Sequence, residues 1–305
     1  METFFASIPI LVLIVLMGVF KVAGDKSSII TLLITAFLAI LAFHSPLPDT
    51  VNSFLYGMLK ALVPILFIIL MAIYSYNVLL QTKKIEVLKQ QFSSISTDKS
   101  VQVLLITWGF GGLLEGMAGF GTAVAIPAAI LISLGFRPVF SALVSLIANS
   151  VPTAFGAVGV PVIVLAQETG LPVIPLSTAV VLQLSVLMLL VPLVITFLAD
   201  PRMKALPKNL LLSLLVGGVS LATQYLAARY IGAETPAIVG AIASIIVIVV
   251  IGKLTGKGGE KPIPMTYSGG EVFRAWAVYV LIMVLILFTS PLFPAVREML
   301  SGGCS

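Results

Sequence analysis

The 305-residue sequence has little of the chemistry that enzymes use. It contains one histidine, His44, and one cysteine, Cys304, which excludes an intrachain disulfide and a cysteine-rich metal site. No second histidine or cysteine is present to complete a catalytic Ser/His or Cys/His pairing. All four aspartates fall in predicted loops, and the phosphate-binding pattern G-x-x-x-x-G-K-[ST] does not occur. We therefore expect no enzyme, no cofactor, no metal and no nucleotide-driven pump.

Charged residues are also scarce, at 10% of the chain against about 25% in soluble domains, whereas hydrophobic residues make up 59%. Apolar runs of about 20 residues recur, which is typical of an all-α polytopic membrane protein in a lipid bilayer. The net charge of +5 implies no nucleic-acid partner, because most Lys and Arg fall in short loops that set membrane orientation. We predict a single membrane domain, 1–305, with about eight transmembrane helices near 4–20, 27–43, 53–80, 141–166, 174–199, 209–228, 236–252 and 273–290. The first three lie within 1–80 and the last four within 174–290.

One stretch, 109–121, interrupts the apolar pattern with six glycines and one carboxylate, Glu115. A charge at membrane depth costs roughly 2.5–3.5 kcal/mol on insertion scales. Glycine-broken backbone is tolerated there only inside protein or along a wet cavity. Together these features predict a site for a small solute. The alternatives are helix packing by Gly112 and Gly116 and a structural hydrogen bond by Glu115.

Charge counting predicts that residues 101–134 enter the membrane and return. In that case fourteen Lys and Arg share one side, which should be cytoplasmic, and only Arg229 and Arg297 lie opposite. A single crossing would divide them six against ten. The arms 101–114 and 121–134 have 14 residues each, whereas a crossing needs about 20. We expect a re-entrant helical hairpin and an N-terminus outside the cell.

Two neighbouring segments are also expected to be irregular. Within 141–166, two prolines and two glycines between Asn149 and Pro161 predict a discontinuous helix. Within 83–99, apolar residues three and four apart favour a short cytoplasmic helix on the membrane surface, and a plain connecting loop is the alternative.

The two breaks predict where a proton and an anion would bind. Glu115 is the candidate proton-coupling residue, because a carboxyl group can hold a proton in a dry site and release it when wetted. The second half-helix of the hairpin presents free N–H groups and a positive dipole end, which favour an anionic group. Asn149 could instead cap a helix, and Gln183 is a weaker candidate in mid-span. The candidate substrate-binding residues are Gly119, Phe120, Gly121, Thr122, Asn149, Ser150, Thr153 and Gly156.

At these residues the sequence resembles the L-lactate permease family. Residues 115–126 resemble the family signature E-G-x-A-G-F-G-x-x-V-A-I, and 134–138 and 149–161 resemble the segments that follow it. Residues 6–10 and 274–276 also fit, so the similarity covers nearly the whole chain. The positions that match the family pattern are Glu115, Gly116, Gly119, Phe120, Gly121, Asn149, Pro152 and Gly156.

The sequence departs from the family pattern in two places. Thr122 and Ala123 stand where relatives often have a small residue and then proline, which affects the start of the second half-helix. Lys60 stands where no charge is expected.

The resemblance implies a proton-coupled symporter of L-lactate, glycolate and related 2-hydroxy monocarboxylates in a bacterial inner membrane. It implies half of an inverted-repeat transporter with paired hairpins, because family members are nearly twice as long. On this view the C-terminal repeat is missing, the chain is truncated or split, and its partner is a separate C-terminal half or a second copy. The alternatives are a permease for another organic anion, such as a dicarboxylate, and a non-transporting membrane fragment.

Overall fold

The computed structural model describes residues 2–119, 122–255 and 266–289, together with Phe293, Val296 and Met299. Across these residues the chain forms helices, turns and bends, without a strand. It divides into two compact units, residues 1–67 and 68–305, whereas a single domain, 1–305, is predicted from the sequence.

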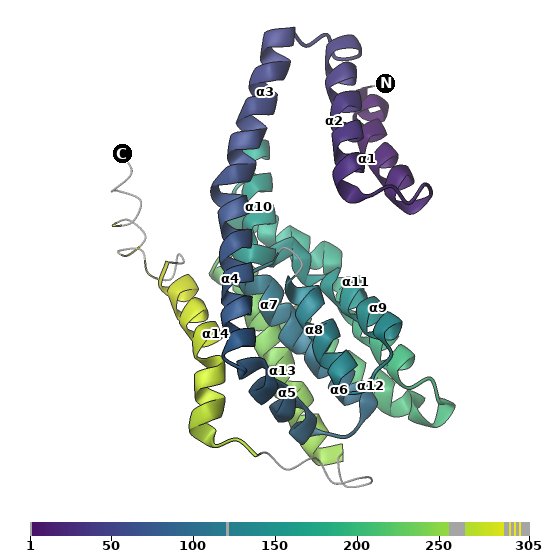
Figure 1. The fold of residues 1–305 in the computed structure, drawn as a ribbon, viewed down its shortest axis with the longest axis vertical. Helices are drawn as coiled ribbons and strands as arrows, with labels where there is room; N and C mark the ends of the chain where they lie inside the picture. The colour runs from purple at the N-terminus through teal and green to yellow at the C-terminus, as the bar shows by residue number, and fades with distance from the viewer. Residues whose placement is uncertain are drawn as a thin grey trace. The chain divides into compact units, whose positions relative to one another are not determined.

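The first unit is built of apolar helices whose side chains face outward. Of its described side chains only Ser27 is buried, whereas Leu33 and Phe37 are 66% and 63% exposed. Helices that expose large apolar side chains suit a lipid environment. The elements of this unit are α1 (Glu2–Gly18), α2 (Gly24–Leu41), α3 (Leu47–Lys60) and the π-helical turn η1 (Ala61–Leu66) (Figure 1).

The predicted span 53–80 is not one uninterrupted helix. Val63 has φ −130° and ψ 116°, so the helical path breaks within η1. The following residue is Pro64, and a residue before proline is disfavoured from helical angles. Proline also removes one helical N–H donor. The helix therefore ends and restarts where the sequence pattern alone favoured continuity.

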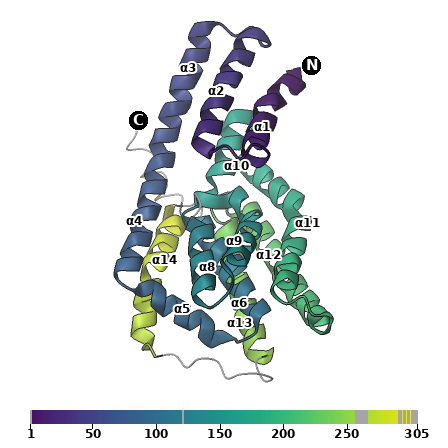
Figure 2. The same cartoon turned by 45° about the vertical axis from the view of Figure 1, so that its right-hand side comes forward.

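The second unit contains the remaining helices, seen from two directions in Figures 1 and 2. Its elements are α4 (Phe67–Gln81), α5 (Lys84–Ile95), α6 (Lys99–Leu104), η2 (Leu105–Phe110), α7 (Gly111–Met117), α8 (Thr122–Ser133), α9 (Pro138–Asn149), η3 (Pro152–Phe155), α10 (Gly156–Thr169), α11 (Val173–Ala199), η4 (Met203–Ala205), α12 (Leu206–Tyr230), α13 (Pro236–Thr255) and α14 (Gly269–Thr289).

By length and composition, five helices in the described part of the chain can cross a membrane, or six if the bent pair α9–α10 counts as one span. The expected number of about eight is therefore not confirmed. Two apolar helices, Phe4–Gly18 and Ala123–Ser133, are shorter than a full crossing. The structure does support a helical, multi-pass membrane protein.

Close helix packing holds α11, α12 and α13 together as consecutive neighbours (Figure 1). At Gly217 of α12, an added Cβ would lie only 2.5 Å from the carbonyl oxygen of Met188 on α11. Lipid tails are as apolar as leucine, so helices in a membrane gain stability from such close contact rather than from apolar burial alone.

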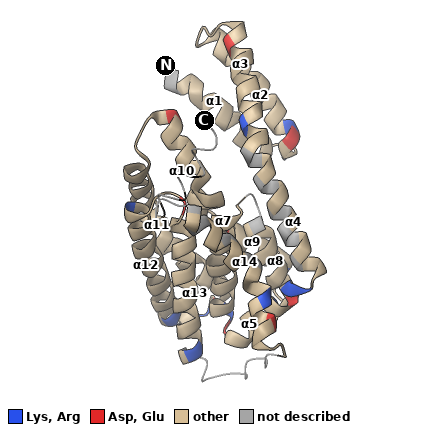
Figure 3. Ribbon diagram, turned by 90° about the vertical axis from the view of Figure 1, so that its left-hand side faces the viewer, with Lys and Arg blue, Asp and Glu red and all other residues tan. Residues whose placement is uncertain are grey.

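Basic residues of the second unit gather at one end of its helices, as Figure 3 shows. Lys208 in the first turns of α12 forms an ion pair with Asp98, which caps α6, whereas Arg229 lies in the last turn of α12. Gly252, near the end of α13, lies against Ser96. The start of α6, the start of α12 and the end of α13 therefore share one end of the unit.

The segment 83–99 contains a helix, α5, but its apolar stripe packs on protein. Leu88 and Phe92 are 0% and 2% exposed, and the Phe92 ring lies 5.1 Å from Phe110 and 6.3 Å from Trp276. The Trp276 ring N–H also donates to Gln91 at 2.7 Å. The apolar stripe of α5 is therefore covered by η2 and α14, whereas a helix lying on the membrane surface would face lipid.

Candidate functional site

Two helical arms, Lys99–Met117 and Thr122–Ser133, form a helical hairpin. Its first arm, α6–η2–α7, runs continuously over Lys99–Met117, and its second arm is α8. The arms lie side by side, since an added Cβ at Gly111 would lie 3.3 Å from both the Ala123 carbonyl oxygen and the Pro127 ring. The arms have 19 and 12 residues instead of the expected 14 each. Every residue from Ser100 to Met117 except Gln102 is buried, so the first arm is covered by other parts of the protein.

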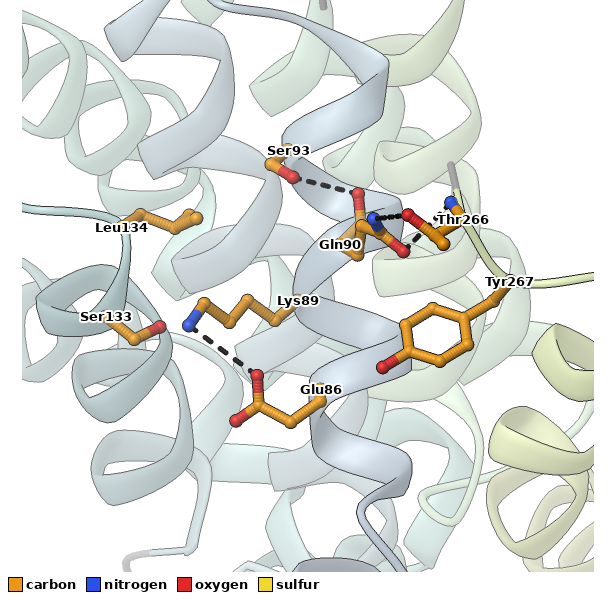
Figure 4. A pocket seen from close by; sticks show the side chains of 8 residues that line it. All are labelled: Glu86, Lys89, Gln90, Ser93, Ser133, Leu134, Thr266 and Tyr267. Atoms are coloured by element: carbon orange, nitrogen blue, oxygen red, sulfur yellow. Dashed lines mark hydrogen bonds and ion pairs between the residues drawn. The ribbon is translucent and has the colours of Figure 1, made fainter. Parts of the chain in front are cut away.

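A cleft brings the end of the second arm next to α5, the helix that precedes the first arm in the sequence (Figure 4). Ser133 and Leu134, at the far end of α8, line it together with α5 and residues Thr266 and Tyr267. The cleft has a volume of about 530 Å³, and in it Lys89 lies 3.6 Å from Glu86. Among the described residues that line the cleft, the one Lys is matched by one Glu, so these residues offer no unbalanced charge to an anion.

Three glycines of the first arm lie on the side that packs against α13. An added Cβ at Gly109, Gly112 and Gly116 would lie 2.7, 3.5 and 2.8 Å, respectively, from side-chain atoms of Ile245, Ala241 and Ile238, all on α13. The packing alternative is therefore confirmed for Gly116, whereas the 3.5 Å at Gly112 is an ordinary contact that leaves room for a Cβ. Only some of the six glycines in 109–121 are therefore left to be explained by a solute site.

The second break lies between α9 and α10, where the chain bends by 54°. Ala157, Val158 and Gly159 have φ values of 45°, 63° and 76°, so three successive residues leave the right-handed helix. A β-branched residue at positive φ is a true outlier, and such strain is found most often at functional sites. The helix resumes near Pro161, whose ring suits a first helical turn. The structure thus has a bent helix pair, Pro138–Asn149 and Pro152–Thr169, in the region where the sequence predicted a discontinuous helix.

The two breaks meet at Glu115. The side chain is 3% exposed, and an added Cβ at Gly156 would overlap its Oε1 and lie 3.1 Å from its Cδ. One turn further on, an added Cβ at Gly119, which has φ +59°, would lie 3.0 Å from the backbone nitrogen of Ala157. The hairpin tip therefore rests directly on residues 156–157.

Asn149 supplies the amide group next to the carboxylate. Its side chain interacts with that of Glu115, and its Nδ2 donates to the Thr153 hydroxyl at 3.1 Å. The Thr153 hydroxyl in turn donates to the Asn149 carbonyl oxygen. Among the described residues, Glu115 Oε2 and Asn149 Oδ1 are buried atoms without a hydrogen-bond partner. Within the described part of the chain, the site therefore combines two acceptor oxygens without a donor.

The other candidate residues are placed as follows. Ser150 is exposed and its hydroxyl donates to the Ile147 carbonyl oxygen at 2.7 Å, so no described contact joins it to Glu115. Phe120 and Gly121 lie outside the described residues. Thr122 begins α8, as the sequence predicted for the second half-helix, and its side chain is also outside the described part.

Sequence reasoning missed one polar pair and favoured a less suitable residue. Gln183 is exposed on α11, whereas Gln224 and Ser220 on α12 are 3% and 1% exposed. The available signal was their spacing, because polar residues four apart share a face of the predicted span 209–228. Nothing in the sequence indicates which face of a mostly apolar helix meets protein.

The fold and site define a class: an all-helical, multi-pass membrane protein in which two broken helices meet at a buried carboxylate. The comparisons with known proteins name the family. The chain belongs to the L-lactate permease family, whose model matches residues 2–304.

Three similar relatives are also permeases. The chain is 39% identical to the L-lactate permease of Streptococcus iniae over 98% of its own length and 64% of the relative's. It is 34% identical to the glycolate permease GlcA of Escherichia coli, over 92% and 54% of the two chains. It is 32% identical to the L-lactate permease of Bacillus subtilis, over 97% and 55%. The chain thus spans roughly half to two thirds of these relatives' length. No solved structure matches it.

Proposed function

We propose that the chain acts in proton-coupled transport of L-lactate, glycolate and related small 2-hydroxy monocarboxylates across a bacterial inner membrane. The observation that carries the proposal is the contact between Glu115 and the second break at Gly156. It joins the acidic group within the apolar hairpin to an irregular backbone of the kind that transporters use at substrate sites. The names of the relatives supply the substrate class.

Glu115 is the proposed proton carrier. Glu115 Oε2 and Asn149 Oδ1 are both acceptors without a partner among the described residues, and a proton on the carboxyl group is the donor that this pair lacks. A monovalent anion that travels with one proton carries no net charge. Uptake should therefore follow the pH gradient more closely than the membrane voltage.

The substrate carboxylate is proposed to bind at the two breaks. The backbone at 119–122 and 149–156 and the side chains of Asn149 and Thr153 are its proposed contacts. The N-terminal end of α8 carries a positive dipole end, which stabilises an anion without an intramembrane arginine. In the same proposal, residues 99–133 form a re-entrant hairpin whose base lies on the cytoplasmic side with the basic residues. The whole unit corresponds to one repeat of an inverted pair.

The test is uptake of radiolabelled L-lactate into vesicles that contain the chain, with an imposed alkaline interior. We expect uptake to rise with the pH gradient and to fall about tenfold or more in Glu115→Gln, a change in barrier of about 1.4 kcal/mol or more. The matched control is Glu168→Gln, which makes the same chemical change at an exposed position and should leave uptake intact. Unchanged uptake in Glu115→Gln would remove the proton role.

A further inference from the structure

A second polar cluster lies within the helices of the second unit and has no part in the site described above. It consists of Gln224 and Ser220 on α12, both almost completely buried. Gln224 Nε2 donates to the Ser220 hydroxyl oxygen at 2.9 Å. Gln224 Oε1 is also buried and has no hydrogen-bond partner among the described residues. Such an acceptor inside an apolar helix bundle is costly unless something donates to it.

Gln224 and Ser220 line a small internal cavity. Its other walls are Trp108 and Gly112 of the hairpin, Pro152 of the second break and two alanines of α13. About 10 Å³ of the cavity is accessible to the centre of a water molecule. That is about enough for one water or one hydroxyl oxygen and too little for a second polar group.

The cavity lies next to the Glu115 site, because the first arm of the hairpin and the second break contribute residues to both. Gly112 precedes Glu115 by three residues on the same helix, a rise of about 4.5 Å. Pro152 precedes Gly156 by four residues on the second break. The same two segments thus form both sites, about one turn apart. One small molecule with two polar groups could reach both.

Gly240 of α13 makes room for the glutamine. An added Cβ at position 240 would overlap the Gln224 side chain, 2.7 Å from its Nε2 and closer still to its Cγ. The amide is therefore confined between α13 on one side and the hydroxyl of Ser220 on the other. Nε2 already donates one of its two N–H groups to Ser220, whereas Oε1 has no partner among the described residues, so Oε1 is the atom that most needs a donor from a ligand.

We propose that Gln224, positioned by Ser220, binds the hydroxyl group of a 2-hydroxy acid. An amide oxygen accepts from an O–H group and repels a carboxylate oxygen, so this position distinguishes the substrate's hydroxyl from its carboxylate. The hydroxyl takes the place that one water molecule would otherwise occupy. The proposal rests on the proposed transport function and assigns the group that separates lactate from an acid without a 2-hydroxyl.

The test compares L-lactate with propionate, which has the same carbon chain and no hydroxyl. The purified full chain is heated in detergent with each anion, and apparent dissociation constants come from the concentration dependence of the unfolding temperature. In the unmodified chain we expect lactate to bind about 2- to 10-fold more tightly, as one neutral hydrogen bond predicts. In Gln224→Met this ratio should fall to about one.

Gln183→Met is the matched control, because it makes the same substitution on an exposed face of α11 and should keep the ratio. Ser220→Ala is a second variant, for use if Gln224→Met does not fold. It leaves the amide in place without its anchor, and it should also reduce the ratio of the two dissociation constants. Equal binding of both anions by the unmodified chain, or an unchanged ratio in the Gln224 and Ser220 variants, overturns the hydroxyl site and leaves the carrier proposal standing. Stabilisation by neither anion overturns the proposed function itself.

Discussion

The carboxyl group of Glu115 lies against Gly156, so closely that a methyl group at position 156 would overlap the carboxylate oxygen. These residues lie in different broken helices, α7 in the hairpin and α10 after the second break. Their contact makes the two irregular segments a single site. It also explains a glycine that helix packing alone does not require.

Gly156→Ala should displace Glu115 or the second break. Overpacking a tight contact typically costs about 1–3 kcal/mol, so we expect a lower unfolding temperature together with a strong loss of lactate uptake. The matched control is Gly218→Ala on α12, where an added Cβ meets nothing within 4 Å. Alanine there should be neutral or stabilising, because it favours the helix by up to about 1 kcal/mol. If Gly156→Ala and Gly218→Ala had the same unfolding temperature and the same lactate uptake, the close contact at Gly156 would be contradicted.

Single cysteines should report the course of the hairpin. In a Cys304→Ser background, Lys99→Cys and Ser133→Cys should react with a membrane-impermeant thiol reagent from the same side, because both ends of the hairpin lie at the basic end of the unit. Arg229→Cys, at the other end of α12, should react from the opposite side. All three positions are exposed, so accessibility within the protein does not limit the reaction. Labelling of Lys99→Cys and Ser133→Cys from opposite sides would show that 99–133 crosses once.

Asp200, in the connection after α11, should make stability depend on acid pH. Arg202 donates to both carboxylate oxygens at 2.7 Å and lowers the pKa of Asp200 from 3.8 to about 2. A lowered pKa in the folded state means that the stabilisation is complete above about pH 4 and is lost as the pH falls toward 2.

Asp200→Asn should therefore lower the unfolding temperature slightly at neutral pH. The effect should be small, on the order of 1 kcal/mol or less, because Arg202 is largely exposed. Thermal unfolding of both proteins from pH 7 down to pH 2 should show the difference shrinking only below about pH 4. A difference that stays constant down to pH 2 would mean that the ion pair does not stabilise the fold.

The sequence predicted the positions of the irregular segments better than their surroundings. Proline and glycine act on the backbone of their own neighbourhood, so the break around 152–161 and the end of the first arm near Glu115 could be located from the sequence. The burial of α5 could not, because a stripe of apolar residues fits lipid and protein equally well. Gln183 and Gln224 illustrate the same limit, since both lie within apolar spans and only one of them faces other helices.

The sequence by itself determined that this is a helical membrane protein of the lactate permease family with a carboxylate inside a broken, glycine-rich segment. The motifs at 115–126 and 149–161 carry the resemblance to the family. Composition, run length and local backbone chemistry are sufficient for the rest, because they act within a few residues of each other. The tertiary structure decided which glycines pack against α13, that Glu115 meets Gly156, and that Gln224 faces a cavity beside them. Those contacts join segments far apart along the chain, and their geometry depends on how whole helices pack.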